Sequence, residues 1–355
     1  MKLQKRGNNF IGLCPFHSEK TPSFNVNDND GFYHCFGCGA HGDAISFLRE
    51  MDGLDFMEAV ERLADMAGLS MPKSMHIDPA VTRQRKAALD ILEETTRFFE
   101  AGLRADEGRD AAQYLKQRGL DAAIVKNFRL GYAPRSGLQT ALAGKDFSDD
   151  DMIMAGVLGK SDRDGRLYDY FRNRVIFPIE NRQGKVIAFG ARALGDAQPK
   201  YLNSGDSPTF SKKAVLYGWV QAREAVRRKS PLVVVEGYMD VIAVQRSGIA
   251  AAVAPLGTAL NPEQITLLWK LHDEPILCFD GDAAGQRAQL RALERILPLL
   301  EPGRSARLAM LPAGKDPDDV LGETGPEGLR KILGTAQALV DSMWTTTAAK
   351  FDTQK

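Results

Sequence analysis

The chain has 355 residues, 44% of them hydrophobic, which is enough for two or three domains with cores of their own. Its 46 basic and 46 acidic side chains cancel, so the total charge gives no sign of a polyanionic partner. The four cysteines are too few for a secreted disulfide scaffold, and neither a secretory signal nor an apolar run of about 18 residues is present. We therefore expect a cytoplasmic protein with no membrane partner.

The first 70 residues predict a small domain of short strands followed by two helices. Aromatic residues, Gly and Pro alternate with Asn and Asp between residues 10 and 40, a pattern typical of strands and turns. Apolar residues at helical spacing around 44–48 and 56–64 predict the helices. A linker is expected at 71–85, because prolines stand at 72 and 79.

The rest of the chain predicts two kinds of fold. Helical spacing near 87–92 and 114–115 is followed by Gly-punctuated β segments between 128 and 220, which indicates an α+β region. From residue 231 strands and helices alternate, which predicts a compact parallel or mixed α/β sheet. Strands are expected at 174–179, 185–190, 232–235, 251–254 and 276–279, and helices at 241–245, 262–271 and 286–297.

A metal site is indicated by Cys14-Pro-Phe-His17 and, 17 residues later, Cys35-Phe-Gly-Cys38. Four such ligands in two turns match tetrahedral zinc with no open position, so we predict one structural zinc ion per chain. A unit of this size would bury too little surface to fold without the ion. His34 and His41 are alternatives to His17, and the two-residue spacing of the first turn favours His17.

Acidic residues follow two of the predicted apolar strands. Glu236 comes after Val233-Val234-Val235, with Asp240 close behind, and Asp280 and Asp282 come after the strand that contains Cys278. Carboxyl ends of strands are where open α/β sheets bind ligands. Because two residues separate Asp280 from Asp282, an extended segment would point both carboxylates the same way.

A third acidic group contains Asp316 and Asp318, after a strand-like segment at 307–311. Carboxylates brought together repel one another unless a cation lies between them, and oxygen ligands select Mg²⁺ or Mn²⁺. Each motif alone is more often a turn. Their appearance on successive strands predicts a catalytic metal site for phosphoryl transfer.

The middle of the chain is basic, with 15 Lys or Arg against 7 Asp or Glu between residues 160 and 229. Cations in such a region can bind template phosphates or the triphosphate of a nucleotide, and a merely solvated surface has the same composition. The candidate residues are Arg172, Arg174, Arg192, Lys200, Lys212 and Lys213.

Taken together, these motifs resemble the bacterial replicative primases of the DnaG type from about Asn9 to about Leu321. The segments at 14–17 and 33–39 are similar to the family's zinc ribbon. The family's polymerase domain is similar to the segments at 128–134, 172–179 and 199–204. Its TOPRIM metal site is similar to the segments at 236–240, 280–282 and 316–318. The resemblance implies an enzyme that makes RNA primers on single-stranded DNA from ribonucleoside triphosphates.

Roles for individual residues follow from the resemblance. Catalysis would involve Glu236, Asp280, Asp282 and Lys212, and template or nucleotide would contact Arg192 and Lys200. The catalytic Mg²⁺ or Mn²⁺ ions would be held by Glu236, Asp240, Asp280, Asp282, Asp316 and Asp318. Further implied partners are the RNA–DNA primer duplex, the replicative DNA helicase and single-strand binding protein, at the replication fork.

The expected architecture is multidomain, combining α/β and α+β parts. It comprises a zinc ribbon (1–70), a linker (71–85), an α+β subdomain of the polymerase domain (86–229), a TOPRIM α/β subdomain (230–313) and a C-terminal helical part (314–355). Family members usually have a helical segment before the ribbon and a separate helicase-binding domain at the end, so the sequence is expected to be a fragment.

Three other functions are compatible with parts of this pattern. Another TOPRIM enzyme, such as a type IA topoisomerase or a nuclease, would use the same acids to break DNA, but a topoisomerase needs a tyrosine in a large further domain. A primase–helicase fusion would carry a G-x-x-x-x-G-K-[ST] loop, which is absent from this sequence. A zinc-ribbon DNA-binding protein without catalysis would not need the acidic motifs.

Overall fold

The computed structural model describes residues 1–355 except 18, 53, 55, 70–78, 258 and 351–355. It forms two compact units, Met1–Arg83 and Gln84–Lys355, and each is considered by itself. Most of the expected linker, residues 71–78, lies outside the described residues. Its remainder differs from the expectation, because helix α3 already begins at Pro79.

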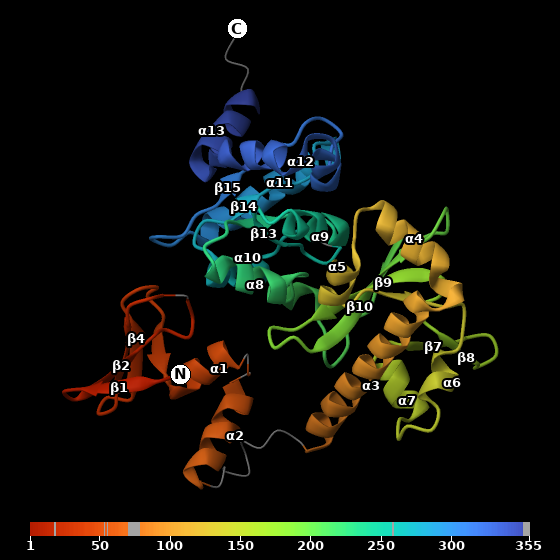
Figure 1. Ribbon diagram of the computed structural model, residues 1–355, viewed down its shortest axis with the longest axis horizontal. Coiled ribbons are helices and arrows are strands. Elements are labelled where there is room, and N and C mark those ends of the chain that lie inside the picture. Colours follow the sequence, from red (N-terminus) through yellow and green to blue (C-terminus); the bar gives the residue numbers. More distant parts are fainter. Residues whose placement is uncertain (18, 53, 55, 70–78, 258, 351–355) are drawn as a thin grey trace. The chain divides into compact units, whose positions relative to one another are not determined.

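The first unit is a five-stranded antiparallel sheet, in the order β1-β2-β3-β4-β5, followed by two helices (Figure 1). Its core is aromatic: the rings of Phe24 and Tyr33 stack with their centroids 5.2 Å apart, and Phe16 and Phe47 pack on them. The elements are β1 (Leu3–Arg6), β2 (Asn9–Gly12), β3 (Phe24–Asn27), β4 (Phe32–Cys35), β5 (His41–Asp43), α1 (Ala44–Met51) and α2 (Phe56–Ala67). The strands and both helices agree with the sequence pattern.

The α+β part of the second unit is built on an antiparallel sheet, in the order β11-β10-β9-β6. Strand β9 is buried along nearly its whole length, which explains its run of apolar residues. The strands are β6 (Gly131–Ala133), β7 (Leu158–Lys160), β8 (Leu167–Asp169), β9 (Arg174–Glu180), β10 (Val186–Ala193) and β11 (Tyr201–Asn203). The helices are α3 (Pro79–Arg104), η2 (Asp106–Gly108), α4 (Arg109–Gln117), α5 (Ala122–Asn127), α6 (Leu138–Leu142) and α7 (Asp149–Met154).

The α/β part contains a second sheet in the order β13-β12-β14-β15-β16, parallel except for β16. Residues of β12 alternate between two core clusters, so both faces of this sheet are covered, as a parallel sheet requires. The strands are β12 (Leu232–Val234), β13 (Ala251–Val253), β14 (Ile276–Leu277), β15 (Arg307–Leu308) and β16 (Gln337–Ala338). The helices are η3 (Lys212–Ala214), α8 (Trp219–Arg227), α9 (Tyr238–Arg246), α10 (Pro262–Leu271), α11 (Ala283–Ile296), η4 (Leu297–Leu299), α12 (Pro317–Gly334) and α13 (Leu339–Lys350).

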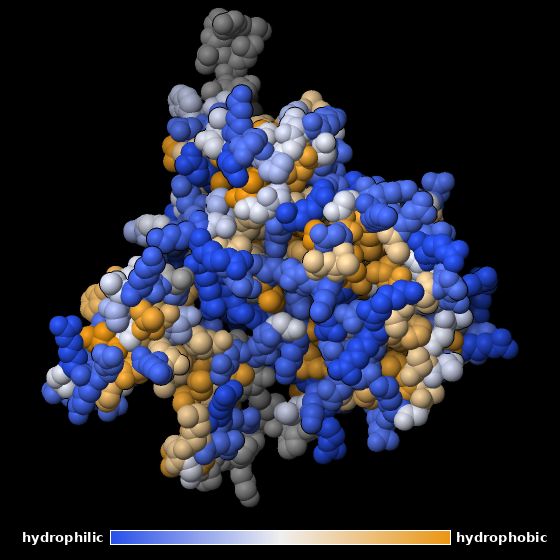
Figure 2. Space-filling view, in the orientation of Figure 1, coloured by the Kyte–Doolittle hydropathy of each residue, from blue (hydrophilic) through white to orange (hydrophobic). Residues whose placement is uncertain are grey.

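Hydrophilic side chains cover much of the face seen in Figure 2, with apolar ones in separate patches between them. Among the described residues, no helix combines the length and the apolar character needed to span a bilayer.

Candidate metal centres and catalytic site

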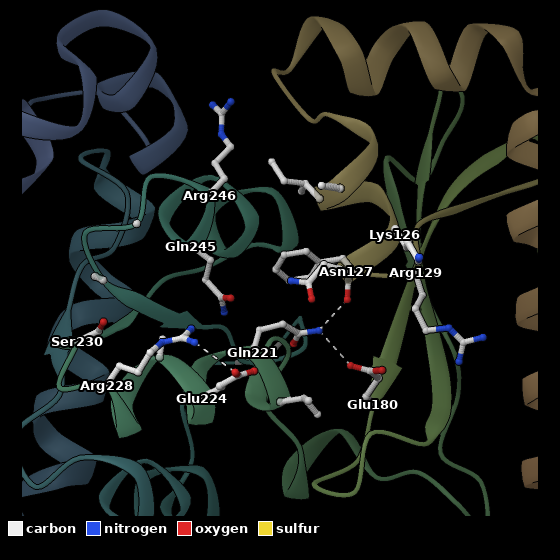
Figure 3. Close-up of a pocket in the computed structure, with 17 residues that line it drawn as sticks. Lys126, Asn127, Arg129, Glu180, Gln221, Glu224, Arg228, Ser230, Gln245 and Arg246 are labelled. Carbon is white, nitrogen blue, oxygen red and sulfur yellow. Dashed lines mark hydrogen bonds and ion pairs between the residues drawn. The ribbon is translucent and has the colours of Figure 1, made fainter. Parts of the chain in front are cut away.

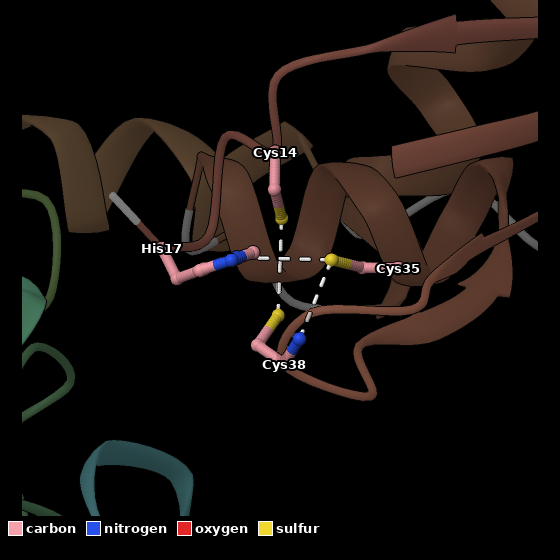
Figure 4. Close-up of side chains that lie close together, drawn as sticks. All are labelled: Cys14, His17, Cys35 and Cys38. Atoms are coloured by element: carbon pink, nitrogen blue, oxygen red, sulfur yellow. Dashed lines mark hydrogen bonds between the residues drawn. The ribbon is translucent and has the colours of Figure 1, made fainter. Parts of the chain in front are cut away.

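The first unit brings the four predicted zinc ligands together (Figure 4). Their sulfur and nitrogen atoms all lie within 4.8 Å of one another. The sulfurs of Cys14 and Cys38 are 3.8 Å apart, and His17 Nδ1 lies 3.7 Å from the sulfur of Cys35. A tetrahedral ion with Zn–S bonds of about 2.3 Å separates two sulfurs by about 3.8 Å, so the cluster fits zinc.

The other two histidines considered as ligands lie outside this cluster. The ring of His34 packs against Phe36, with centroids 4.5 Å apart, and the ring of His41 lies 6.0 Å from that of His34. His17 is therefore the histidine in position to be the fourth ligand. The ribbon thus uses the two-residue spacing for both pairs of ligands.

The surroundings shift the pKa values of the cysteine thiols in the cluster in different directions. Burial raises the pKa of the Cys14 thiol to about 12. Burial acts in the same direction on Cys35, but hydrogen bonds from Ser23 and from the backbone of Cys38 and Gly37 outweigh it and lower the pKa of that thiol. A bound zinc ion would stabilise all three thiolates, because a coordinated thiol loses its proton.

In the second unit, the sheet order places the acidic residues at one edge. Strands β12, β14 and β15 are parallel neighbours, so their carboxyl ends lie side by side. The backbone N–H of Asp280 donates to Glu236 Oε1 at 3.1 Å, which joins the segments after β12 and β14. We call this set the acidic edge: Glu236, Asp240, Asp280, Asp282, Asp316 and Asp318.

The acidic edge has a strong mutual repulsion. Burial, and after it the charges of Glu236 and Asp316, raise the pKa of Asp280 to about 7. Burial, followed by repulsion from Asp316 and Asp280, raises the pKa of Asp240 well above its usual range. Asp280 Oδ1 is buried and has no hydrogen-bond partner. An unpaired carboxylate oxygen among other carboxylates fits a divalent cation with oxygen ligands.

Three of the aspartates at this edge also cap helices. Asp240 Oδ2 accepts from Gly237 N at 3.1 Å at the start of α9. Asp282 Oδ1 accepts from Ala284 N and Gly285 N at 2.8 and 2.7 Å at the start of α11. Asp316 Oδ1 accepts from Asp319 N at 2.7 Å at the start of α12. These bonds hold each carboxylate in one direction and leave its other oxygen available.

Asp318 differs from the other acids, because two arginines hold it. Its side chain is 8% exposed; Oδ2 accepts from Arg118 at 2.7 Å and Oδ1 from Arg246 at 3.2 Å. Arg246 also donates to the carbonyl of Gly119, so helices α4, α9 and α12 meet at this point. Cation binding by Asp318 would require the exchange of at least one of these bonds. Neither arginine was among the site residues predicted from the sequence.

Arg192 lies between two tyrosine rings. Its guanidinium carbon is 4.4 Å from the ring centroid of Tyr114 and 5.9 Å from that of Tyr201. The Nε atom of Arg192 and the hydroxyl of Tyr114 are buried without hydrogen-bond partners. The same Tyr114 ring also faces Arg118, at 6.0 Å. Stacking therefore holds Arg192 in place, and sequence reasoning missed Tyr114.

The other basic candidates have different surroundings. Arg174 is buried, 8% exposed, and donates to Pro199 O at 2.7 Å, so its guanidinium supports the fold. Arg172 lies over the ring of Tyr168, at 5.1 Å. Lys200 and Lys213 are exposed. Lys212 and Lys213 form the short helix η3, whose carbonyls accept hydrogen bonds from Gln264 and Asn261.

A cavity of about 950 Å³ lies in the second unit (Figure 3). It opens between α5, α8 and the end of α9, and none of the acids of the acidic edge lines it. Gln221 reaches across it to Glu180 Oε2 and to the carbonyl of Asn127, both at 3.2 Å. Most of its polar side chains already have hydrogen-bond or ion-pair partners, inside or outside the lining, so the cavity carries no functional assignment.

Three family models match successive parts of the chain. Residues 1–78 match the CHC2 zinc finger, residues 98–223 the N-terminal domain of the DNA primase catalytic core, and residues 230–308 the Toprim domain. The first match agrees with the observed cysteine and histidine cluster, and the third with the part of the sheet that carries most of the acidic edge.

Curated relatives and solved structures point the same way. DNA primase of Pasteurella multocida is 42% identical over 99% of this chain, and that of Escherichia coli 42% over 96%. The chain spans 61% and 59% of their lengths. A DNA primase domain from Pseudomonas aeruginosa is 41% identical with a TM-score of 0.72, covering 76% of this chain and 85% of that one. The structure of the zinc-binding and RNA polymerase domains of Aquifex aeolicus primase is 33% identical with a TM-score of 0.68, and the match covers 99% of this chain and 85% of that one.

Proposed function

The chain belongs to the DnaG-type DNA primases, and from that premise we propose that it synthesises short RNA primers on single-stranded DNA from ribonucleoside triphosphates. The observation that carries the proposal is the convergence of carboxylates from three neighbouring parallel strands. A match of residues 98–223 to the primase core favours this reaction over that of a type IA topoisomerase or a nuclease.

The acidic edge is the proposed site of the catalytic Mg²⁺ or Mn²⁺ ions. Bound there, the ions would lower the pKa of the attacking hydroxyl and neutralise charge on the phosphates. Glu236 and Asp280 are the central ligands in this proposal, because Asp280 has the unpaired oxygen and its N–H fixes Glu236. The helix-capping bonds of Asp240, Asp282 and Asp316 orient the remaining carboxylates.

Template and nucleotide are proposed to bind beside this edge. Arg192 is held in place by Tyr114 and Tyr201, and an arginine fixed by stacking loses little side-chain entropy when it meets a phosphate. Lys200 and Lys213 are exposed, and with Lys212 and Arg172 they would add attraction for the template or triphosphate. A similar structure, 36% identical, is described as the DnaG primase catalytic domain bound to single-stranded DNA, which supports the template assignment.

The zinc ribbon is proposed to bind template and to influence where synthesis starts. Family membership further suggests the primer duplex, the replicative helicase and single-strand binding protein as partners at the replication fork. We propose these for the longer protein, since the chain spans about six-tenths of its curated relatives.

A primer-synthesis assay on mixed single-stranded templates with Mg²⁺ or Mn²⁺ tests the proposal. Glu236→Gln removes one negative charge at the centre of the acidic edge. The rate should fall by about 100-fold or more, because charge stabilisation by a catalytic metal is worth several kcal/mol. Glu263→Gln, an exposed glutamate in the first turn of α10, makes the same chemical change elsewhere and should keep the parental rate. Equal rates for the two variants would contradict the assignment.

A further inference from the structure

Glu19 lies beside the zinc ligands without being one of them. Its side chain is 10% exposed, and both oxygens are engaged. Oε1 accepts from the backbone N–H of Cys14 at 2.7 Å and from that of Ser23 at 3.1 Å. Oε2 accepts from the hydroxyl of Ser23 at 2.5 Å and lies 3.3 Å from Nε2 of His17. A carboxylate with four polar neighbours is held in one orientation.

The contact with His17 distinguishes its two ring nitrogens. Nδ1 faces the sulfur of Cys35, and Nε2 faces Glu19. A neutral imidazole carries one proton, and a carboxylate favours that proton on the nitrogen next to it. With the proton on Nε2, the lone pair of Nδ1 is free for the metal ion. A carboxylate 3.3 Å from Nε2 would favour the tautomer that ligates through Nδ1.

Glu19 also connects the two turns that carry the ligands. Its bond to Cys14 N fixes the first turn, and Ser23, which donates to Glu19, lies 3.2 Å from the sulfur of Cys35 in the second turn. The space is tight: a Cβ atom on Gly37 would lie 2.6 Å from His17 Nε2 and 2.7 Å from Ser23 Oγ. Three of the four ligands thus have a contact with Glu19 or with its partner Ser23.

We propose that Glu19 is a positioning residue of the zinc centre, which sets the tautomer of His17 and holds the two ligand turns together. Hydrogen bonds from the hydroxyl of Ser23 and the backbone of Cys14 hold its carboxylate between the two turns. Metal binding by the ribbon does not depend on whether the chain makes primers.

The first measurement is zinc affinity of the whole chain, by competition with a chromophoric chelator. Glu19→Gln keeps the size of the side chain but presents a neutral amide to His17. Loss of such a partner should weaken zinc binding by about 10- to 100-fold. Glu50→Gln makes the same change at an exposed position on α1 of the same unit and should leave the affinity at the parental value.

The second measurement is the tautomer of His17, from ¹⁵N spectra of the zinc-loaded chain labelled at histidine. In the parent, the proton should be on Nε2 and protected from exchange. Glu19→Gln should shift this signal or speed its exchange, an effect that a purely structural role would not have. Parental zinc affinity together with an unchanged His17 signal would overturn the proposal.

If the ribbon of Glu19→Gln does not fold with zinc, Glu19→Asp tests the proposal in its place. It keeps the charge but is one methylene shorter, so it cannot reach Cys14 N and His17 together. Weaker zinc binding with a changed His17 signal would support the proposal. Parental values for both would refute it.

Discussion

The two arginines around Asp318 give a quantitative test of how the second unit is held together. Arg118→Met removes one of them and keeps most of the apolar stem. Removing one partner of a buried ion pair costs about 3–5 kcal/mol. Arg246 still holds Asp318, and the side chain of Arg118 is 37% exposed, so screening reduces the effect. We expect a loss of about 1–3 kcal/mol at neutral pH.

The loss should depend on pH. Burial raises the pKa of Asp318, and the charges of Arg118 and Arg246 oppose it. Without Arg118 the pKa of the folded state rises further above that of the unfolded state. The folded variant then binds an extra proton as the pH falls, so its deficit relative to the parent shrinks in acid and grows toward neutral pH.

Urea unfolding followed by tryptophan fluorescence measures this loss. The three tryptophans, Trp219, Trp269 and Trp344, all lie in the second unit, so the signal excludes the zinc ribbon. Arg109→Met is the matched control: Arg109 is the first residue of α4, the helix that Arg118 directly follows, and its pair with Asp106 is exposed, at 75% and 94% for the two side chains. This control should change stability little.

Equal losses for Arg118→Met and Arg109→Met would refute the reasoning. Adding Asp318→Asn to Arg118→Met completes a double-mutant cycle. If Arg118 and Asp318 stabilise each other, Asp318→Asn should lower the free energy of unfolding less in the Arg118→Met variant than in the parent.

Further expectations concern zinc, pH, backbone space and stacking. Removal of zinc with a chelator should unfold the ribbon, which circular dichroism detects. The tryptophan fluorescence, which comes from the second unit, should stay unchanged. Because the pKa of Asp280 is about 7, Mn²⁺ must displace a proton from this carboxyl group when it binds below that pH. The apparent affinity of the chain for Mn²⁺, measured by calorimetry, should therefore rise through pH 7 and then level off. Gly281→Ala would place Cβ 2.0 Å from Pro312 O, so it should lower both the melting temperature and Mn²⁺ affinity. Tyr114→Leu should weaken template binding several-fold, because it removes the cation–π contact with Arg192. Tyr114→Phe removes only a hydroxyl without a hydrogen-bond partner, so it should bind template as the parent does. Fluorescence anisotropy with a labelled single strand measures template binding by both variants.

Local patterns predicted those elements whose signals are local. Helix α10 has the predicted bounds, Pro262–Leu271, because Asn261 caps it, Pro262 occupies its first turn and Gln264 completes a capping box. The alternation of apolar residues and turns similarly identified the parallel strands. Strand order brings Glu236 to Asp280, and alternating strands and helices made that order a reasonable expectation.

The parts that sequence reasoning missed depend on distant contacts. Arg118 and Asp318 are 200 positions apart, and nothing in the residues around either one indicates the other. Glu19 is a single acid in a polar segment, and its role appears only when the chain folds back to place Ser23 and His17 beside it. The prolines predicted a linker through residue 85, but Pro79 is the first residue of a helix, a position where proline is well tolerated.

The helix-capping bonds at the acidic edge have an evolutionary consequence. Asparagine caps a helix about as well as aspartate does, and it carries no charge. Exchange of Asp282 or Asp316 for asparagine would preserve the start of α11 or α12 while removing a negative charge from the edge. Folding would therefore not resist such drift, and a descendant of this chain could become a stable pseudoenzyme by single codon changes. Only selection for the chemistry itself would keep aspartate at these two places.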